Sequence, residues 1–213
     1  MTLEDVLMRD DGFLPKARYT SPDFAALEFE RLWSRVWQVA CRVEQVARPG
    51  DYVEYTIGDE SVLVVGGDDG TIRAFHNTCL HRGSQLATDV GTFADGCIRC
   101  PYHAWKYALD GELVEIVDRD EFTNIPDGMT MHLRSVRVDT FGGFVFVNLD
   151  ADAEPLADFL DPLASVLAPY HLERMRFRSY LTTIIDANWK AVVDAFNEGY
   201  HVQGLHSQIL RWT

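Results

Sequence analysis

The chain has 213 residues, of which 47% are hydrophobic and 12% aromatic, enough for one large domain or two small ones with a sizeable core. Its formal net charge of −14 at pH 7 argues against nucleic-acid binding, because so acidic a surface repels phosphate backbones. No apolar run reaches about 18 residues and the N-terminus is acidic, so we expect neither a membrane span nor a secretory signal. Four cysteines are too few for a disulfide scaffold, and we expect a cytoplasmic protein.

The residue pattern predicts a helix, then a β-rich region, then further helices. Ser21-Pro22-Asp23 is typical of a helix start, and apolar residues recur at helical spacing to about Gln38. Alternating apolar residues and turn signals predict strands at 52–57, 61–65, 71–75, 97–99, 105–107, 113–116, 132–138 and 144–149. The acidic, proline-ended stretch 150–155 predicts a boundary, followed by a helical segment 156–167, an extended segment 176–185 and a helix from 188 to about 202. We therefore divide the chain into 1–38, 39–152 and 153–213.

Two Cys/His pairs lie inside the β-rich region. Cys79-Leu-His81 is followed, after 18 residues, by Cys100-Pro-Tyr-His103. Loops between strands can bring such pairs to one metal centre, and two cysteines with two histidines can hold a tetrahedral zinc ion. The tight C-x-H spacing and the mixture of sulfur and nitrogen in each pair favour a [2Fe–2S] cluster, with both thiolates on one iron and both imidazoles on the other. The remaining cysteines, Cys41 and Cys97, are expected to be buried thiols.

A second pattern follows near the end of the sequence. His201 and His206 are five positions apart, so on a straight helix they would point in different directions. They can share a metal if the helix ends or kinks between them, which Gly204 allows. Two imidazoles and one carboxylate form the facial triad of non-haem Fe(II), which leaves positions open for oxygen and substrate. By themselves, two histidines near a helix end are more often structural.

Both patterns resemble those of one family. The runs Cys79–Gly83, Cys100–Trp105 and Asp110–Leu113 resemble the cluster-binding loops of Rieske proteins, a similarity that covers roughly residues 40–150. Ser84 and Tyr102 stand where the respiratory-complex type has a pair of disulfide-forming cysteines, so the chain is more similar to the oxygenase and ferredoxin branch. Ala104 stands where the family often has glycine. The run from Asn188 to His206 resembles the iron-binding segment of Rieske non-haem iron oxygenase (aromatic ring-hydroxylating dioxygenase) α subunits, and the chain is identified as the N-terminal portion of one.

The resemblance implies an α+β fold: an all-β Rieske [2Fe–2S] domain of antiparallel sheets at 39–152, then the truncated start of a helix-grip (START-like) catalytic domain. The segment 1–38 precedes both as a helical element. The implied cluster ligands are Cys79, His81, Cys100 and His103. His201 and His206 would hold a mononuclear Fe(II), whose third, carboxylate ligand lies downstream in the family, so we expect the 213 residues alone to be inactive. Glu198, or as second choice Asp194, would bridge the iron site to a cluster histidine of a neighbouring subunit.

The implied function is that of a terminal oxygenase, which hydroxylates an aromatic or related ring with O2 as a mono- or dioxygenase. Electrons would come from NAD(P)H through a reductase, directly or by way of a ferredoxin, and the assembly would be a homotrimer or an α3β3 hetero-oligomer. One alternative is a ferredoxin-like Rieske protein that transfers electrons and has no oxygenase activity. Another is a structural or regulatory partner that has lost its chemistry. Iron content separates the first two, and visible absorption of the cluster tests the third.

Overall fold

The computed structural model describes residues 12–126 and 128–212. These residues form two compact units, one made of residues 31–178 and the other of residues 12–30 together with 179–212. The helical segment that begins the chain therefore shares a unit with the segment that ends it. This division differs from the three consecutive segments expected from the sequence.

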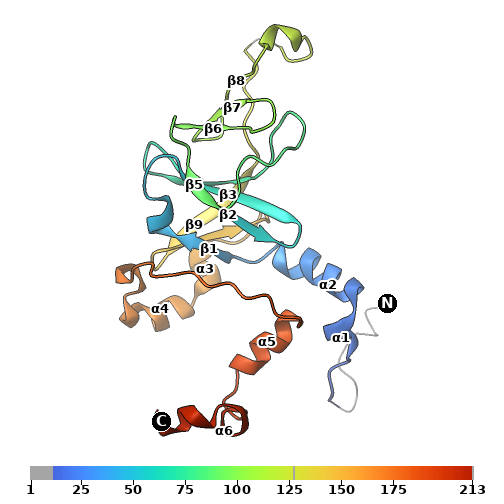
Figure 1. The fold of residues 1–213 in the computed structure, drawn as a ribbon, viewed down its shortest axis with the longest axis vertical. Coiled ribbons are helices and arrows are strands. Elements are labelled where there is room, and N and C mark those ends of the chain that lie inside the picture. The colour runs from blue at the N-terminus through green and yellow to red at the C-terminus, as the bar shows by residue number, and fades with distance from the viewer. Residues whose placement is uncertain (1–11, 127, 213) are drawn as a thin grey trace. The chain divides into compact units, whose positions relative to one another are not determined.

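The unit 31–178 is built on two antiparallel sheets (Figure 1). A seven-stranded sheet has the order β1-β10-β9-β4-β3-β2-β5, and a three-stranded sheet has the order β6-β7-β8. The strands are β1 (Gln38–Arg42), β2 (Asp51–Ile57), β3 (Glu60–Gly66), β4 (Ile72–His76), β5 (Val90–Thr92), β6 (Cys97–Arg99), β7 (Lys106–Ala108), β8 (Leu113–Glu115), β9 (Ser135–Phe141) and β10 (Phe144–Asn148). This arrangement confirms the expected all-β antiparallel domain.

Strand β3 separates two hydrophobic cores. Leu63 and Val65 belong to one core and Val62 and Val64 to the other, as expected for side chains that alternate between the faces of a sheet. All four are fully buried, and each contributes roughly 1.5–3 kcal/mol relative to an exposed side chain. The first core continues into the three-stranded sheet, where it includes Cys79, Cys100, Trp105 and Tyr107. The loops that carry the metal-ligand candidates are thus anchored in this core.

The predicted helices are shorter than expected. The first consists of α1 (Ala17–Thr20), α2 (Pro22–Glu28) and a π-helical turn at Phe29–Trp33, and Gln38 already begins β1. The expected helix at 156–167 is split into α3 (Leu156–Leu160) and α4 (Leu163–Leu167), because Pro162 lacks an N–H group and disfavours helical geometry in Asp161. The residues 176–185 form no strand. Short 3₁₀ turns occupy Val43–Val46, Arg119–Glu121, Ala168–Tyr170, Leu172–Arg174 and Ser207–Trp212.

The second unit contains α1, α2, α5 (Trp189–Phe196) and α6 (Val202–Leu205). Both longer helices begin with a side-chain cap: Ser21 Oγ accepts from the N–H of Phe24, and Asn188 Oδ1 accepts from the N–H of Lys190. The helix expected from 188 to about 202 ends at Phe196, which separates α5 from α6. Over the described ranges, none of the helices has the length and apolar character needed to cross a bilayer.

Candidate metal centres

Two tight loops present the first set of candidate ligands. Cys79 and His81 lie between β4 and β5, where the N–H of Gly83 donates to Cys79 O and the N–H of Cys79 donates to Ser84 O. Cys100 and His103 lie between β6 and β7, where the N–H of Ala104 donates to Cys100 O. Each loop thus turns back on itself within about five residues, which directs a sulfur and an imidazole from each loop to the same end of the small sheet.

Ala104 has a left-handed backbone conformation, with φ of 57°. This region suits glycine, because the alanine Cβ approaches the following carbonyl. We expect Ala104→Gly to raise the free energy of unfolding by about 0.5–1 kcal/mol, measured by chemical denaturation followed by circular dichroism. Ala94→Gly is the matched control, since Ala94 lies in a neighbouring turn and is not among the residues with positive φ. The free energy of unfolding of Ala94→Gly should fall slightly. Equal changes in the unfolding free energy of both variants would contradict strain at Ala104.

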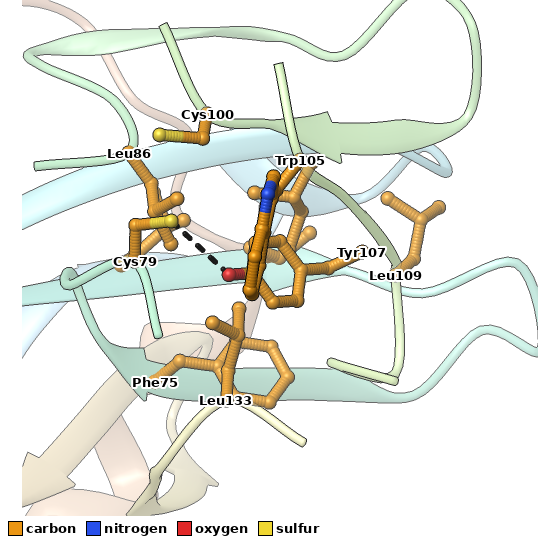
Figure 2. Close-up of a cluster of buried hydrophobic side chains, with 11 residues drawn as sticks. Phe75, Cys79, Leu86, Cys100, Trp105, Tyr107, Leu109 and Leu133 are labelled. Carbon is orange, nitrogen blue, oxygen red and sulfur yellow. Dashed lines mark hydrogen bonds between the residues drawn. The ribbon is translucent and has the colours of Figure 1, made fainter. Parts of the chain in front are cut away.

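The thiols and the imidazoles form separate pairs. Cys79 and Cys100 are both 2% exposed, neither forms a disulfide, and each influences the pKa of the other (Figure 2). The rings of His81 and His103 meet edge to face with centroids 4.6 Å apart, and both are partly exposed. The site therefore has a buried sulfur side and a partly exposed nitrogen side.

Burial and hydrogen bonds act differently on the two thiols. Burial is the main cause that raises the pKa of Cys79. Burial also has the largest single effect on the pKa of Cys100 and acts to raise it. Hydrogen bonds from the N–H groups of Tyr102 and His103, the Cys79 thiol and the Ser84 hydroxyl together lower this pKa by more than burial raises it. The pKa of Cys100 is consequently below its ordinary value. Backbone N–H groups directed at a sulfur stabilise the thiolate, the form in which cysteine binds metal.

The structure offers a direct test of whether these residues fit a [2Fe–2S] cluster. Nδ1 of His81 is buried and has no hydrogen-bond partner among the described residues, an expensive state for an imidazole nitrogen unless it binds another group. A bond from this nitrogen to a metal would remove that energetic cost. Over residues 12–126 and 128–212, no three His, Cys, Asp or Glu side chains gather as they would around a single ion. Two sulfurs and two nitrogens in separate pairs are the donor set that a cluster with two irons requires.

The aromatic side chains of Trp105, Tyr107 and Phe122 surround this site, and of these three only Trp105 belongs to the runs that resemble the Rieske loops. The Tyr107 hydroxyl lies 3.2 Å from Cys79 Sγ and accepts a hydrogen bond from the Leu80 N–H (Figure 2). The His81 ring stacks on Trp105 at 4.8 Å, and Phe122 meets both rings edge-on. The alternation of Trp105, Tyr107 and Leu109, all buried, was the available signal that these residues share one face. Of the two outlying cysteines, Cys41 is buried as expected, whereas Cys97 is only partly buried.

The second set of candidate ligands lies in the unit 12–30 and 179–212. The ring centroids of His201 and His206 are 5.5 Å apart, and the rings are inclined at 76°. His201 is the N-cap and His206 the C-cap of the single-turn helix α6. Gly204, which would allow a kink between the two histidines, lies within α6, and the chain breaks earlier, between Phe196 and His201. The two rings approach each other because His206 leaves helical geometry, with φ of −123° and ψ of 36°, so the divergence of positions five apart on a straight helix does not apply.

The two candidate bridging acids have different partners. Glu198 Oε1 lies 2.5 Å from His201 Nδ1, while Glu198 Oε2 accepts from the backbone N–H groups of Tyr200 and His201. The hydrogen bond from the His201 side chain is the largest cause that lowers the pKa of Glu198. Because Nδ1 of His201 is engaged, Nε2 remains for a metal, the usual arrangement of a carboxylate–histidine pair. Asp194 instead accepts from the Tyr19 hydroxyl at 3.0 Å, four positions before Glu198.

Both sets of residues lie within regions of the chain that match known families. Residues 36–129 match the Rieske [2Fe-2S] domain, and residues 168–213 match the catalytic domain of ring hydroxylating alpha subunits. The glycine betaine monooxygenase oxygenase subunit of Chromohalobacter salexigens is 37% identical over 94% of this chain and 44% of its own length.

Solved structures show the same likeness. The quaternary ammonium Rieske monooxygenase in complex with its substrate L-carnitine has a TM-score of 0.86 at 30% identity, over 92% of this chain and 56% of that one. Naphthalene 1,2-dioxygenase from Rhodococcus sp. bound to indole has a TM-score of 0.83 at 29% identity, over 95% of this chain and 47% of that one. The chain spans about half the length of the curated relatives it matches. With a Rieske domain and the catalytic-domain match in this order in one sequence, the chain belongs to the family of Rieske oxygenase α subunits.

Proposed function

We propose that this chain is part of a terminal oxygenase, in which both metal sites serve one reaction: the insertion of oxygen into an organic substrate. The observation that carries the proposal is that two different sets of donors occur in one chain. One combines buried thiols with paired imidazoles, and the other combines His201 and His206 with a carboxylate on His201 Nδ1. An electron-transfer protein needs only the first set.

The roles follow from the donor atoms. Cys79 and Cys100 with His81 and His103 would hold the [2Fe–2S] cluster, and His201 and His206 would provide two ligands of the mononuclear Fe(II). When bound, the cluster supplies single electrons and the mononuclear iron activates O2. Glu198 keeps the proton on His201 Nδ1, which fixes the tautomer and leaves Nε2 as the ligand atom.

For the substrate we propose a quaternary ammonium compound. Support comes from the relatives, whose names refer to glycine betaine and carnitine monooxygenases. An aromatic ring, expected from the sequence, is the second candidate and is supported by the similarity to naphthalene 1,2-dioxygenase. Glycine betaine, carnitine, choline and naphthalene, supplied to the intact protein with a reductase, separate the two classes by which of them yields an oxygenated product.

The proposed partners are a reductase that takes electrons from NAD(P)H, with or without a ferredoxin between them. The proposed assembly is a homotrimer or an α3β3 hetero-oligomer, since the bridging role of Glu198 requires a neighbouring subunit. Size-exclusion chromatography with light scattering gives the number of copies. A monomer under conditions of turnover would contradict the bridge between subunits.

The direct test is the iron content of the anaerobically reconstituted protein. We expect about three irons and two acid-labile sulfides per chain, with about two irons left in His201→Ala and a Rieske absorption spectrum that does not change. Cys100→Ala should lose the spectrum but retain the mononuclear iron. Two irons in the unsubstituted protein would favour the ferredoxin-like alternative, and no visible absorption would favour a structural partner.

A further inference from the structure

Helix α5, which leads to the His201/His206 pair, is tied to the start of the chain by a largely buried ion pair. Lys190 Nζ lies 2.7 Å from Glu28 Oε1, and Trp189 Nε1 donates to Glu28 Oε2 at 3.3 Å. The side chains of Lys190 and Glu28 are only 17% and 11% exposed. One carboxylate at the end of α2 thus binds two consecutive residues in the first turn of α5.

Aromatic rings surround the Lys190 ammonium. Its nitrogen lies 5.5 Å from the ring centroid of Tyr19, 5.3 Å from that of Phe24 and 5.1 Å from that of Trp189. Rings at this distance attract a cation, and aromatic cages of this kind also bind alkylammonium ligands. Here the protein's own lysine occupies the cage, so a cage emptied by substitution should accept a small ammonium ion in its place.

A second tie lies at the other end of α5. The Tyr19 hydroxyl donates to Asp194 Oδ2 at 3.0 Å, so α1 contacts the last turn of α5 while α2 contacts the first. Together with the Glu28 contacts, this hydrogen bond ties both ends of α5 to the start of the chain. Contacts at both ends of α5 restrain the direction of the helix axis and the rotation of the helix about that axis.

We propose that Glu28 and Lys190 are positioning residues for the metal site at His201 and His206. The chain leaves α5 at Asn197, and Glu198 follows at once, so the orientation of the helix determines where the Glu198–His201 pair begins. Loss of the ion pair frees the first turn of α5 and spreads the positions of both histidines. The inference rests on the proposed function, because it assumes that these histidines bind a metal.

The test is the affinity of the intact protein for Co(II), a spectroscopic substitute for Fe(II), titrated at the mononuclear site after the cluster has been assembled. We expect Lys190→Ala to weaken Co(II) binding about 10-fold or more without changing the Rieske spectrum. n-Propylammonium, which matches the three carbons and the ammonium group that Lys190→Ala removes, should restore most of the affinity, whereas n-propanol should not. Lys16→Ala, in the same unit but outside the cage, serves as the control and should bind Co(II) normally.

Glu28→Gln provides a milder variant that keeps the shape of the side chain and removes its charge. It should also weaken Co(II) binding while the thermal unfolding of the cluster domain remains unchanged. His201→Ala distinguishes the absence of a metal site from the absence of a positioning role alone. If it binds Co(II) as tightly as the unsubstituted protein, both the metal site and its positioning are overturned. If His201→Ala loses binding but Lys190→Ala and Glu28→Gln do not, the positioning role alone is overturned.

Discussion

Replacing Glu198 by glutamine should slow product formation by about 10- to 100-fold while the iron content stays the same. The carboxylate has two tasks in the structure: Oε1 pairs with His201 Nδ1, and Oε2 accepts two backbone N–H groups. Glutamine can keep one acceptor, but its NH2 group must then face hydrogen-bond donors. The variant also removes the negative charge that the proposed proton-coupled link between two imidazoles requires.

The pKa of Glu198 sets the pH range in which this pairing exists. Because its pKa is lowered in the folded protein, mainly by the His201 hydrogen bond, the carboxylate is charged at neutral pH. The stabilising contribution of the charged Glu198 carboxylate is present above the ordinary glutamate pKa. It is lost as the pH falls through the pKa that Glu198 has in the folded protein. Glutamine mimics that acid state at every pH, so the variant should also lose the acid limb of the pH profile attributable to this group.

Two further variants are the controls for Glu198. Glu198→Asp keeps the charge and should retain most of the rate. Asp194→Asn removes a charge four positions earlier in the sequence, from a carboxylate that accepts a hydrogen bond from Tyr19. It should slow turnover less than Glu198→Gln does. Turnover in Glu198→Gln equal to that of the unsubstituted protein would remove Glu198 from the electron path. A larger loss in Asp194→Asn would transfer the role to Asp194, the second choice from the sequence.

The sequence predicted the β-rich domain well, because its signals are local. Strands β2, β3, β4, β6, β8 and β10 lie close to the predicted ranges, since each is a short apolar run bounded by turn residues. The edge strands β1 and β5 were not predicted. Val90–Thr92 is only three residues long, and Gln38–Arg42 carries polar residues at both ends of the strand. Such strands are fixed by their partners rather than by their own pattern.

The surroundings of the candidate sites were harder to predict than the ligands. The Cys79/His81 and Cys100/His103 pairs appear in the sequence because each pair lies in one tight loop. The contact of Tyr107 with Cys79 joins a strand to a loop 28 positions away, and the Glu28–Lys190 pair spans 162 positions. Periodicity carries no information about such pairs. The end of α5 at Phe196 is a different kind of failure, because Asn197 and Gly199, residue types that often end helices, follow it in the sequence.

Replacing Tyr107 by phenylalanine should lower the reduction potential of the bound cluster and destabilise the loop that carries Cys79. The Tyr107 side chain is fully buried, and its hydroxyl lies 3.2 Å from Cys79 Sγ. Burial and the contact with Cys79 raise the pKa of Tyr107, so the hydroxyl keeps its proton and acts as a donor to the sulfur. A hydrogen bond to sulfur favours the more negative, reduced state, and a difference of about 1.4 kcal/mol between the two redox states corresponds to roughly 59 mV.

The same substitution leaves the partly buried N–H of Leu80 without its acceptor, which should cost about 1 kcal/mol of unfolding free energy. Redox titration followed by visible absorption measures the first effect, and chemical denaturation measures the second. Tyr102→Phe is the matched control: it removes a hydroxyl from a neighbouring ring that contacts His103 at a tilt of 36° and is 62% exposed. An unchanged potential in Tyr107→Phe would mean that the hydroxyl serves only the Leu80 N–H. An equal fall in both variants would show that the effect comes from the general polarity of the loops, because only Tyr107 directs its hydroxyl at a ligand sulfur.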